Sequence, residues 1–115
     1  MDNVNVDKLV TDTLLSVGVP VERSYFSDQA NEYITFQLIH RGDTNFTDDE
    51  EGAKEYHYGA DIFTKFDFIA LLDRVETAVK EAGFYDFIVN GETYEESTGF
   101  YHVSIEFKFI KLLEV

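Results

Sequence analysis

The sequence predicts a single-domain α+β protein. It is expected to be a two-layer sandwich, with two helices packed on one face of a mostly antiparallel sheet, in the order α-β-β-β-α-β-β. Three observations predict this fold. Two segments carry apolar residues at helical spacing, several others alternate apolar and polar residues, and the strands follow one another through short connections that favour antiparallel pairing. The length of 115 residues suits one domain, because two halves would each lack sufficient core.

The first predicted element is a helix. Asn3 or Asn5 can cap its start, and Gly18 followed by Pro20 ends it. Its apolar stripe consists of Val6, Leu9, Val10, Leu14 and Val17. The stripe predicts that one side of this helix is buried against the sheet.

Three strands are expected next. Val21 to Phe26 and Glu32 to His40 are strand-like and are separated by turn-forming residues, which predicts a hairpin. Arg41 to Lys54 is polar and acidic without apolar periodicity, which predicts a solvated loop. Glu55 to Lys65 returns to strand composition. On one face it places Tyr56, Tyr58, Ala60 and Ile62, and on the other His57, Gly59, Asp61 and Phe63.

A second helix and a terminal hairpin complete the prediction. The helix is expected from an Asp67 cap to about Ala82, with Gly83 closing it. Its predicted buried stripe is Phe68, Ile69, Leu72, Val75, Val79 and Ala82. Phe84 to Val89 and Phe100 to Lys111 are the last two strands, and a second acidic loop is expected between them.

Composition excludes several classes of function. Nine Lys and Arg against 23 Asp and Glu give a net charge of -14, which disfavours static nucleic-acid binding and adhesion to an anionic membrane. The absence of Cys excludes disulfides and thiolate metal sites. No apolar run is long enough to span a bilayer, and the N-terminus lacks the features of a secretory signal. An intracellular, soluble protein is expected.

Sites for catalysis or metals are weakly supported. The acidic run Asp48 to Glu51 lacks the spacing of a calcium loop, and His40, His57 and His102 have no spacing that makes them converge. Asp61 with Glu95 and Glu96 could form an acid/base pair, but Asp61 is more simply expected to pair with Lys65 or to face solvent. No nucleotide-binding, hydrolase or metalloprotease motif is present. The sequence therefore predicts no catalytic residue, no metal and no cofactor.

Assembly contacts are a better interpretation of the aromatic residues. The chain holds 11 Phe and 7 Tyr, more than so small a core needs, and aromatic residues are enriched at protein interfaces. A loop rich in acids could also become ordered on a partner. The candidate interface residues are Phe46, Asp48, Asp49, Glu50, Glu51, Tyr56, Tyr58, Tyr94, Glu95, Glu96 and Phe100.

Two motifs carry a family resemblance. Ala60 to Lys65, with the sequence ADIFTK, leads into the second helix, and Tyr94 to His102, with the sequence YEESTGFYH, leads into the last strand. Together they resemble the small tail-completion proteins of tailed siphophages and prophages. Ser97 stands where these proteins usually have an acidic residue, and Phe100 where they have Leu. The resemblance covers roughly Glu55 to Lys111.

The resemblance implies a structural role without chemistry. It is that of a tail terminator or a tail-to-head joining protein, a subunit of a hexameric ring at the head-proximal end of the tail tube. The expected partners are further copies of the chain, the tail tube protein and the head connector protein. The expected location is the tail of the virion, reached from the host cytoplasm during assembly. An acidic lumen would repel passing DNA, which suits a conduit.

Two other functions stay open at the level of sequence. An acidic inhibitor or DNA mimic that binds a basic partner would use the same net charge of -14, with its carboxylates arrayed on one face. A small enzyme would use a carboxylate site at Asp61, Glu95 and Glu96. Capture of host nucleases or repressors would support the first, and alanine variants of the three acids that keep all function would exclude the second.

Overall fold

The computed structural model describes residues 4–44 and 52–112, and it confirms the α+β fold and the order of its elements. The elements are α1 (Val6–Leu15), β1 (Val21–Arg23), β2 (Glu32–Thr44), β3 (Ala53–Thr64), α2 (Phe68–Glu81), β4 (Tyr85–Glu95) and β5 (Phe100–Leu112). The strands form one sheet in the spatial order β1-β2-β3-β5-β4. Strand β3 lies at its centre and pairs antiparallel with β2 and β5, while β4 and β5 form the expected terminal hairpin.

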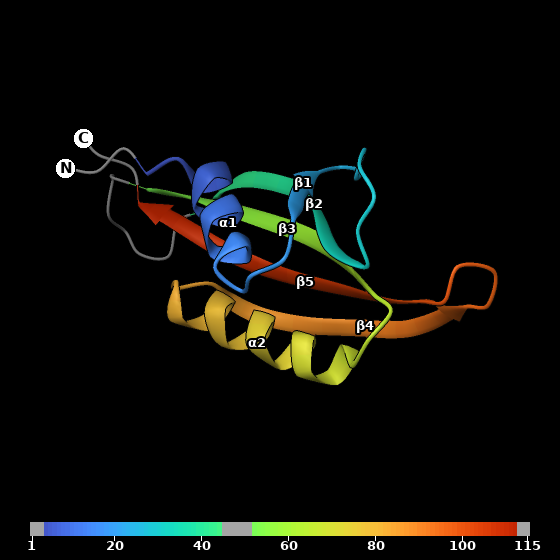
Figure 1. Ribbon diagram of the computed structural model, residues 1–115. Coiled ribbons are helices and arrows are strands. Elements are labelled where there is room, and N and C mark those ends of the chain that lie inside the picture. The colour runs from blue at the N-terminus through green and yellow to red at the C-terminus, as the bar shows by residue number, and fades with distance from the viewer. Residues whose placement is uncertain (1–3, 45–51, 113–115) are drawn as a thin grey trace.

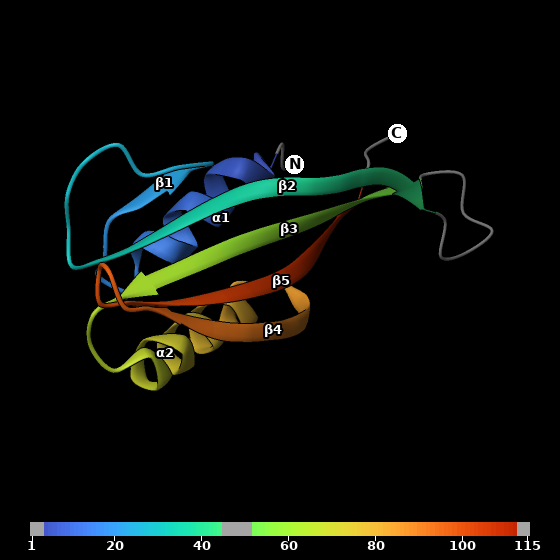
Figure 2. The ribbon, with the colours of Figure 1, turned by 90° about the vertical axis from the view of Figure 1, so that its right-hand side faces the viewer.

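Both helices lie on the same face of the sheet, α1 over β2 and β3 and α2 nearer β4 and β5 (Figures 1 and 2). No described element covers the other face, which is called the open face below. The molecule is elongated, 53 × 23 × 21 Å. Figure 1 shows the start of α1 and the end of β5 at one end and the tip of the β4–β5 hairpin at the other, which is called the distal end.

The core fills the space between the helices and the sheet. Every second residue of β3 and β5 points to the helices, because successive side chains of a strand face opposite ways. The buried side chains of these strands are Tyr58, Ala60, Ile62, Val103, Ile105 and Phe107, and those of the helices include Val10, Leu14, Leu71, Val75 and Val79. The predicted stripe of α2 is wrong at Ile69, which is 53% exposed, because Leu71 takes the buried position.

The predicted helix ends are confirmed. The side chain of Asn5 accepts a hydrogen bond from the backbone N–H of Lys8 at 3.0 Å, which caps α1. Asp67 caps α2 by accepting from the N–H groups of Ile69 and Ala70 at 3.0 and 3.2 Å. Gly83, which follows α2, has a φ of +99°, the left-handed conformation that glycine adopts without strain.

The predicted hairpin of the first two strands is wrong. Strand β1 is three residues long and runs parallel to β2, with Val21 opposite Ile34 and Arg23 opposite Phe36. Ser24 ends β1 with a φ of +70°, and its N–H donates to the carbonyl of Phe36. The chain then turns away and returns through residues 24–31 to begin β2 beside β1, so no tight turn joins the two strands.

Three other strands extend further than predicted. Strands β2 and β3 continue into the polar segment, where the ion pair between Lys54 and Asp43 at 2.7 Å links them. Strand β4 continues through Asn90 and Gly91, which had predicted a turn. Gly91 has a φ of +131° at a register shift between β4 and β5, so this glycine permits a bulge and not a chain reversal.

No helix of the described segments is long and apolar enough to cross a membrane.

Candidate assembly surface

The open face carries a row of side chains at the distal end of the sheet. Registers across three strands bring the row together: Tyr33 of β2 lies opposite Phe63 of β3, and Phe63 lies opposite His102 of β5. None of these residues is fully buried, because no described element covers this face. The two motifs of the sequence, Ala60 to Lys65 and Tyr94 to His102, therefore meet in space on adjacent strands.

Aromatic stacking holds the row together. The rings of Phe26 and Tyr33 stack with centroids 4.5 Å apart, and those of Tyr33 and Phe63 with centroids 4.7 Å apart. The imidazole of His102 stacks on Phe63 at 4.5 Å and nearly parallel, and Phe100 meets the edge of Tyr33 at 5.6 Å. We call these five residues the distal cluster. Stacked rings keep few rotamers, so the cluster presents a preordered surface.

A carboxylate fixes the position of His102 within the distal cluster. Oδ1 of Asp61 lies 2.8 Å from Nε2 of His102 and accepts a hydrogen bond from the Ser104 hydroxyl at the same distance. His102 and Asp61 are partly exposed, with side-chain exposures of 38% and 26%. Ser104 donates to the carboxylate of Asp61 and not to the imidazole. The arrangement holds the ring of His102 in one orientation.

A cation and an open cleft border the distal cluster. Nζ of Lys65 lies 5.0 Å from the centre of the Phe100 ring, within range of a cation–π interaction. Among the described residues this ammonium group forms no ion pair. The cleft beside it has a volume of about 630 Å³. It is lined by Asp28, Gln29, Ala30, Asn31, Tyr33, Lys65, Ser97, Thr98 and Phe100. Burial, with a smaller contribution from the charge of Glu95, raises the pKa of Tyr33, so the phenol at this cleft stays neutral at physiological pH.

A second polar network lies further along the open face. Nε2 of His57 lies 2.6 Å from Oε1 of Glu106, and Asn90 donates to the other oxygen of Glu106 at 2.7 Å. Hydrogen bonds from Asn90 and then from His57 lower the pKa of Glu106. Because Asn90 belongs to β4, Glu106 to β5 and His57 to β3, the network ties three strands together on the uncovered face. Among the described residues, no three His, Cys, Asp or Glu side chains are placed to hold a metal ion.

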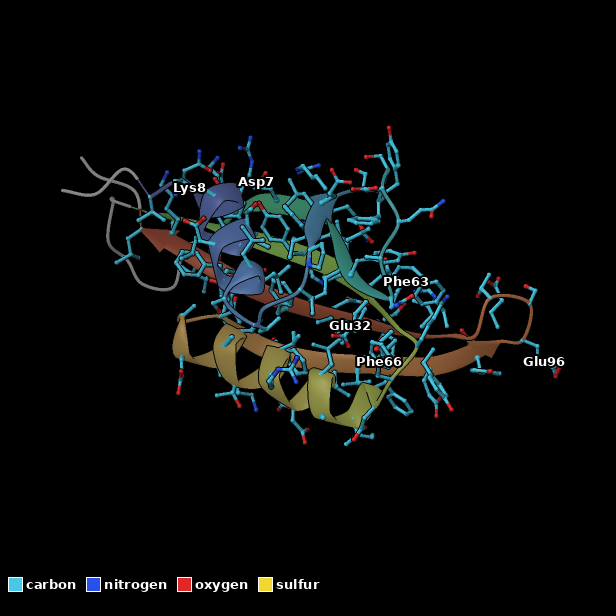
Figure 3. The ribbon with its side chains drawn as sticks, in the orientation of Figure 1. Asp7, Lys8, Glu32, Phe63, Phe66 and Glu96 are labelled. Carbon is cyan, nitrogen blue, oxygen red and sulfur yellow. The ribbon has the colours of Figure 1, made fainter. Side chains whose placement is uncertain are left out.

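The sequence-based interface candidates occupy different places. Glu96 lies at the hairpin tip (Figure 3). Glu95 is the last residue of β4 and accepts a hydrogen bond from Thr98 at 2.6 Å, and Phe100 belongs to the distal cluster. Tyr94 is 52% exposed, on the helix-covered side at the sheet edge. Phe46, Asp48, Asp49, Glu50 and Glu51 lie outside the described residues.

Two candidate tyrosines lie on the helix-covered side. Tyr58 is 1% exposed and packs between Phe36 and Phe107, so its ring belongs to the core and no partner can reach it. Its neighbour Tyr56 is partly exposed, and the guanidinium of Arg41 lies over its ring at 5.8 Å. As interface residues, Tyr56 and the other exposed candidates stay predictions.

Sequence reasoning missed most of the distal cluster. Asp61 contacts neither Lys65 nor the acids of the hairpin tip, as had been considered, because its carboxylate is held by His102 and Ser104. Phe63 and Asp61 were placed correctly on one face of their strand. Their partners could not be named, because the register between β3 and β5 joins residues about forty positions apart.

The comparisons with known proteins give no basis for assigning a function. No protein-family model matches the sequence, and no curated protein does. Among solved structures, a chain of the virion of a native gene transfer agent particle is similar, with 12% identity, 91% of this chain and 92% of that chain covered, and a TM-score of 0.49. The sequence identity and the TM-score are both low, so the function proposed below depends on the residues of this chain.

Proposed function

We propose that this protein is a structural component of a phage or prophage tail. It terminates the tail tube or joins the tail to the head connector, as one subunit of a hexameric ring. Its partners are further copies of the chain, the tube protein and the connector protein. The observation that carries the proposal is the convergence of the two tail-completion motifs: Asp61 and Phe63 of the first contact His102 of the second, and Lys65 contacts Phe100.

The form of this site supports a contact surface. If the motif residues served only to pack the core, their side chains would be buried. The side chains of the distal cluster instead lie on the open face and border an open cleft. The cluster is aromatic, and aromatic residues are enriched at protein interfaces. Aromatic anchors that are rigid before binding lose little entropy when a partner covers them.

Deletion of the gene in its phage or prophage tests the role, with electron microscopy of the particles as the measurement. Overlong tails without heads would identify a terminator, and free tails of normal length beside filled heads would identify a joining protein. Normal particles with heads attached would contradict both. If such particles formed and the protein instead captured a basic host nuclease, the acidic inhibitor would be the better interpretation.

A pair of variants connects the role to the distal cluster. Phe100→Ala removes the ring that Lys65 and Tyr33 contact, and we expect it to reproduce much of the deletion phenotype without loss of the fold. Ile69→Ala removes an exposed apolar side chain from α2, away from the open face, and is expected to support normal particles. Circular dichroism of both variants checks the fold. Normal particles from Phe100→Ala would show that the cluster is not the contact surface.

A further inference from the structure

Both edges of the sheet have unpaired backbone groups. Strand β4 bonds to β5 on one side, and no described strand lies along its other side. At the opposite edge β1 covers only residues 34–36 of β2, so no strand of the described segments pairs with the outer side of β2 from Gln37 to Thr44, which is called its free side below. The N–H and C=O groups of a free edge are a template for another strand, and proteins usually protect such edges with Lys, Pro or bulges.

The β4 edge is apolar and acidic. Ile88, Val89 and Tyr94 are 47%, 46% and 52% exposed, and Glu92 and Glu95 lie beside them. No Lys, Arg or Pro occurs between Tyr85 and Glu95. Bulges interrupt the first half of the strand, but the pairing is regular from Gly91 to Glu95. This half of β4 therefore lacks Lys, Pro and bulges, and its charged side chains are Glu92 and Glu95.

The free side of β2, which has one irregularity of pairing between Leu38 and His40, complements that edge. Leu38 and Ile39 are 37% and 49% exposed, which matches the exposed aliphatic residues of β4. The exposed His40 and Arg41 follow them directly, and Arg41 forms no ion pair with any described residue. One edge thus offers apolar groups with the guanidinium of Arg41, and the other offers apolar groups with carboxylates.

We propose that β4 of one copy adds antiparallel to the free side of β2 in a second copy, so that the sheet continues from subunit to subunit. The strand directions permit this once the second copy is displaced along the strands, because Gly91 to Glu95 lie toward the distal end of the sheet and Gln37 to Thr44 toward the opposite end. Strands β2 and β5 both run antiparallel to β3, and β4 runs antiparallel to β5, so a copy placed alongside brings β4 and β2 together in opposite directions. The two edges differ, so the contact is head-to-tail, the type that closes into rings. The inference rests on the proposed ring and names its subunit interface.

Disulfide mapping tests the contact, because the natural chain has no Cys. Ile39→Cys is combined in turn with Cys at Glu92, Thr93, Tyr94 and Glu95, and each double variant is oxidised and separated without reductant. Opposite residues of antiparallel strands lie about 4.5–5.5 Å apart at Cα, within reach of a disulfide. Because successive side chains face opposite ways, we expect multimer ladders at alternate β4 positions and little cross-linking at the positions between.

Single-Cys variants and a helix position are the controls. Ile39→Cys paired with Ile69→Cys, which lies on α2, is expected to give no ladder, and neither is any single variant. Strong dimers from a single β4 cysteine would mean that β4 pairs with itself, and that result would overturn the head-to-tail contact. Equal cross-linking at all four β4 positions, or none at any of them, would overturn the strand pairing.

Substitution with Lys separates this inference from the proposed function. Val89→Lys adds a charge at the edge and is expected to lower self-association at least tenfold, whereas Ile69→Lys at an equally exposed site leaves it unchanged; analytical ultracentrifugation measures both. If Val89→Lys particles carry normal tails, the interface is wrong although the tail role stands. If the gene deletion has no effect on particles while the ladders persist, the tail role is wrong although the interface stands.

Discussion

Asp7 links α1 to the sheet through more contacts than any other carboxylate described. It accepts from Nε and Nη2 of Arg23 at 3.0 and 3.1 Å and from the hydroxyl of Tyr58 at 2.9 Å (Figure 3 shows Asp7 near the start of α1). Tyr58 was predicted as a contact residue, yet its ring is buried and its hydroxyl depends on Asp7. This polar contact is invisible in the sequence, since the two residues are fifty-one positions apart.

Asp7→Ala should destabilise the protein by about 1–3 kcal/mol, because the buried hydroxyl of Tyr58 loses its acceptor. Removing that hydroxyl as well, in Asp7→Ala with Tyr58→Phe, should recover part of the loss, since neighbouring substitutions are not additive. Urea denaturation measures both. Asp12→Ala, which removes an exposed helix pair with Lys8, serves as the control and should cost about 0.5 kcal/mol or less. A double variant as unstable as the sum of its single variants would contradict the coupling.

The same carboxylate predicts a dependence on pH. The hydrogen bonds from Arg23, with that from Tyr58, hold the pKa of Asp7 below its usual value of 3.8. A lowered folded pKa means that the stabilisation is complete above the unfolded value and is lost as the pH falls through the folded value. The stability difference between wild type and Asp7→Asn should therefore be constant above about pH 5 and shrink below pH 3.8. Denaturation curves at several pH values give this difference, and one that grows on acidification would contradict the assignment.

At the scale of elements, capping and periodicity were sufficient to predict both helices, the central strand and the last strand. The failures have physical causes. The composition of Asn90-Gly91 predicts a turn. The positive φ of Gly91 is equally compatible with a bulge, and pairing with the long strand β5 keeps this segment in β4. The direction of β1 relative to β2 depends on the loop that follows Ser24. Strand β1 is only three residues long, so its sequence holds no pattern that distinguishes parallel from antiparallel pairing.

The Asp67 cap gives a prediction for α2. Asp67→Ala leaves the N–H groups of Ile69 and Ala70 without their side-chain acceptor and should cost about 1 kcal/mol, with a lower melting temperature in calorimetry. Asp73→Ala, on the exposed face in the middle of the same helix, should change stability by less than about 0.5 kcal/mol. If the two variants melt together, α2 does not depend on its cap.

At the scale of the whole molecule, charge and shape act together. The net charge is -14, and the longest dimension is 53 Å. The described ion pairs, such as Lys8–Asp12 and Lys80–Glu76, are mostly exposed and contribute little. Repulsion among the remaining carboxylates therefore opposes both the compact fold and the approach of a second copy.

Salt should consequently stabilise this protein. Raising ionic strength from about 10 mM to about 150 mM shortens the screening length from about 30 Å to about 8 Å, well below the length of the molecule. The melting temperature should rise by several degrees, and self-association through the β4 and β2 edges should strengthen in parallel. The two edges attract each other through a few local charges, whereas whole subunits repel each other through all their carboxylates. Salt therefore weakens the repulsion between subunits more than it weakens the attraction between the edges. Calorimetry and sedimentation over a salt series measure the two responses. A fall in melting temperature with salt would mean that ion pairs outweigh repulsion within the subunit, and weaker association with salt would mean that attraction between the edges dominates the contact between copies.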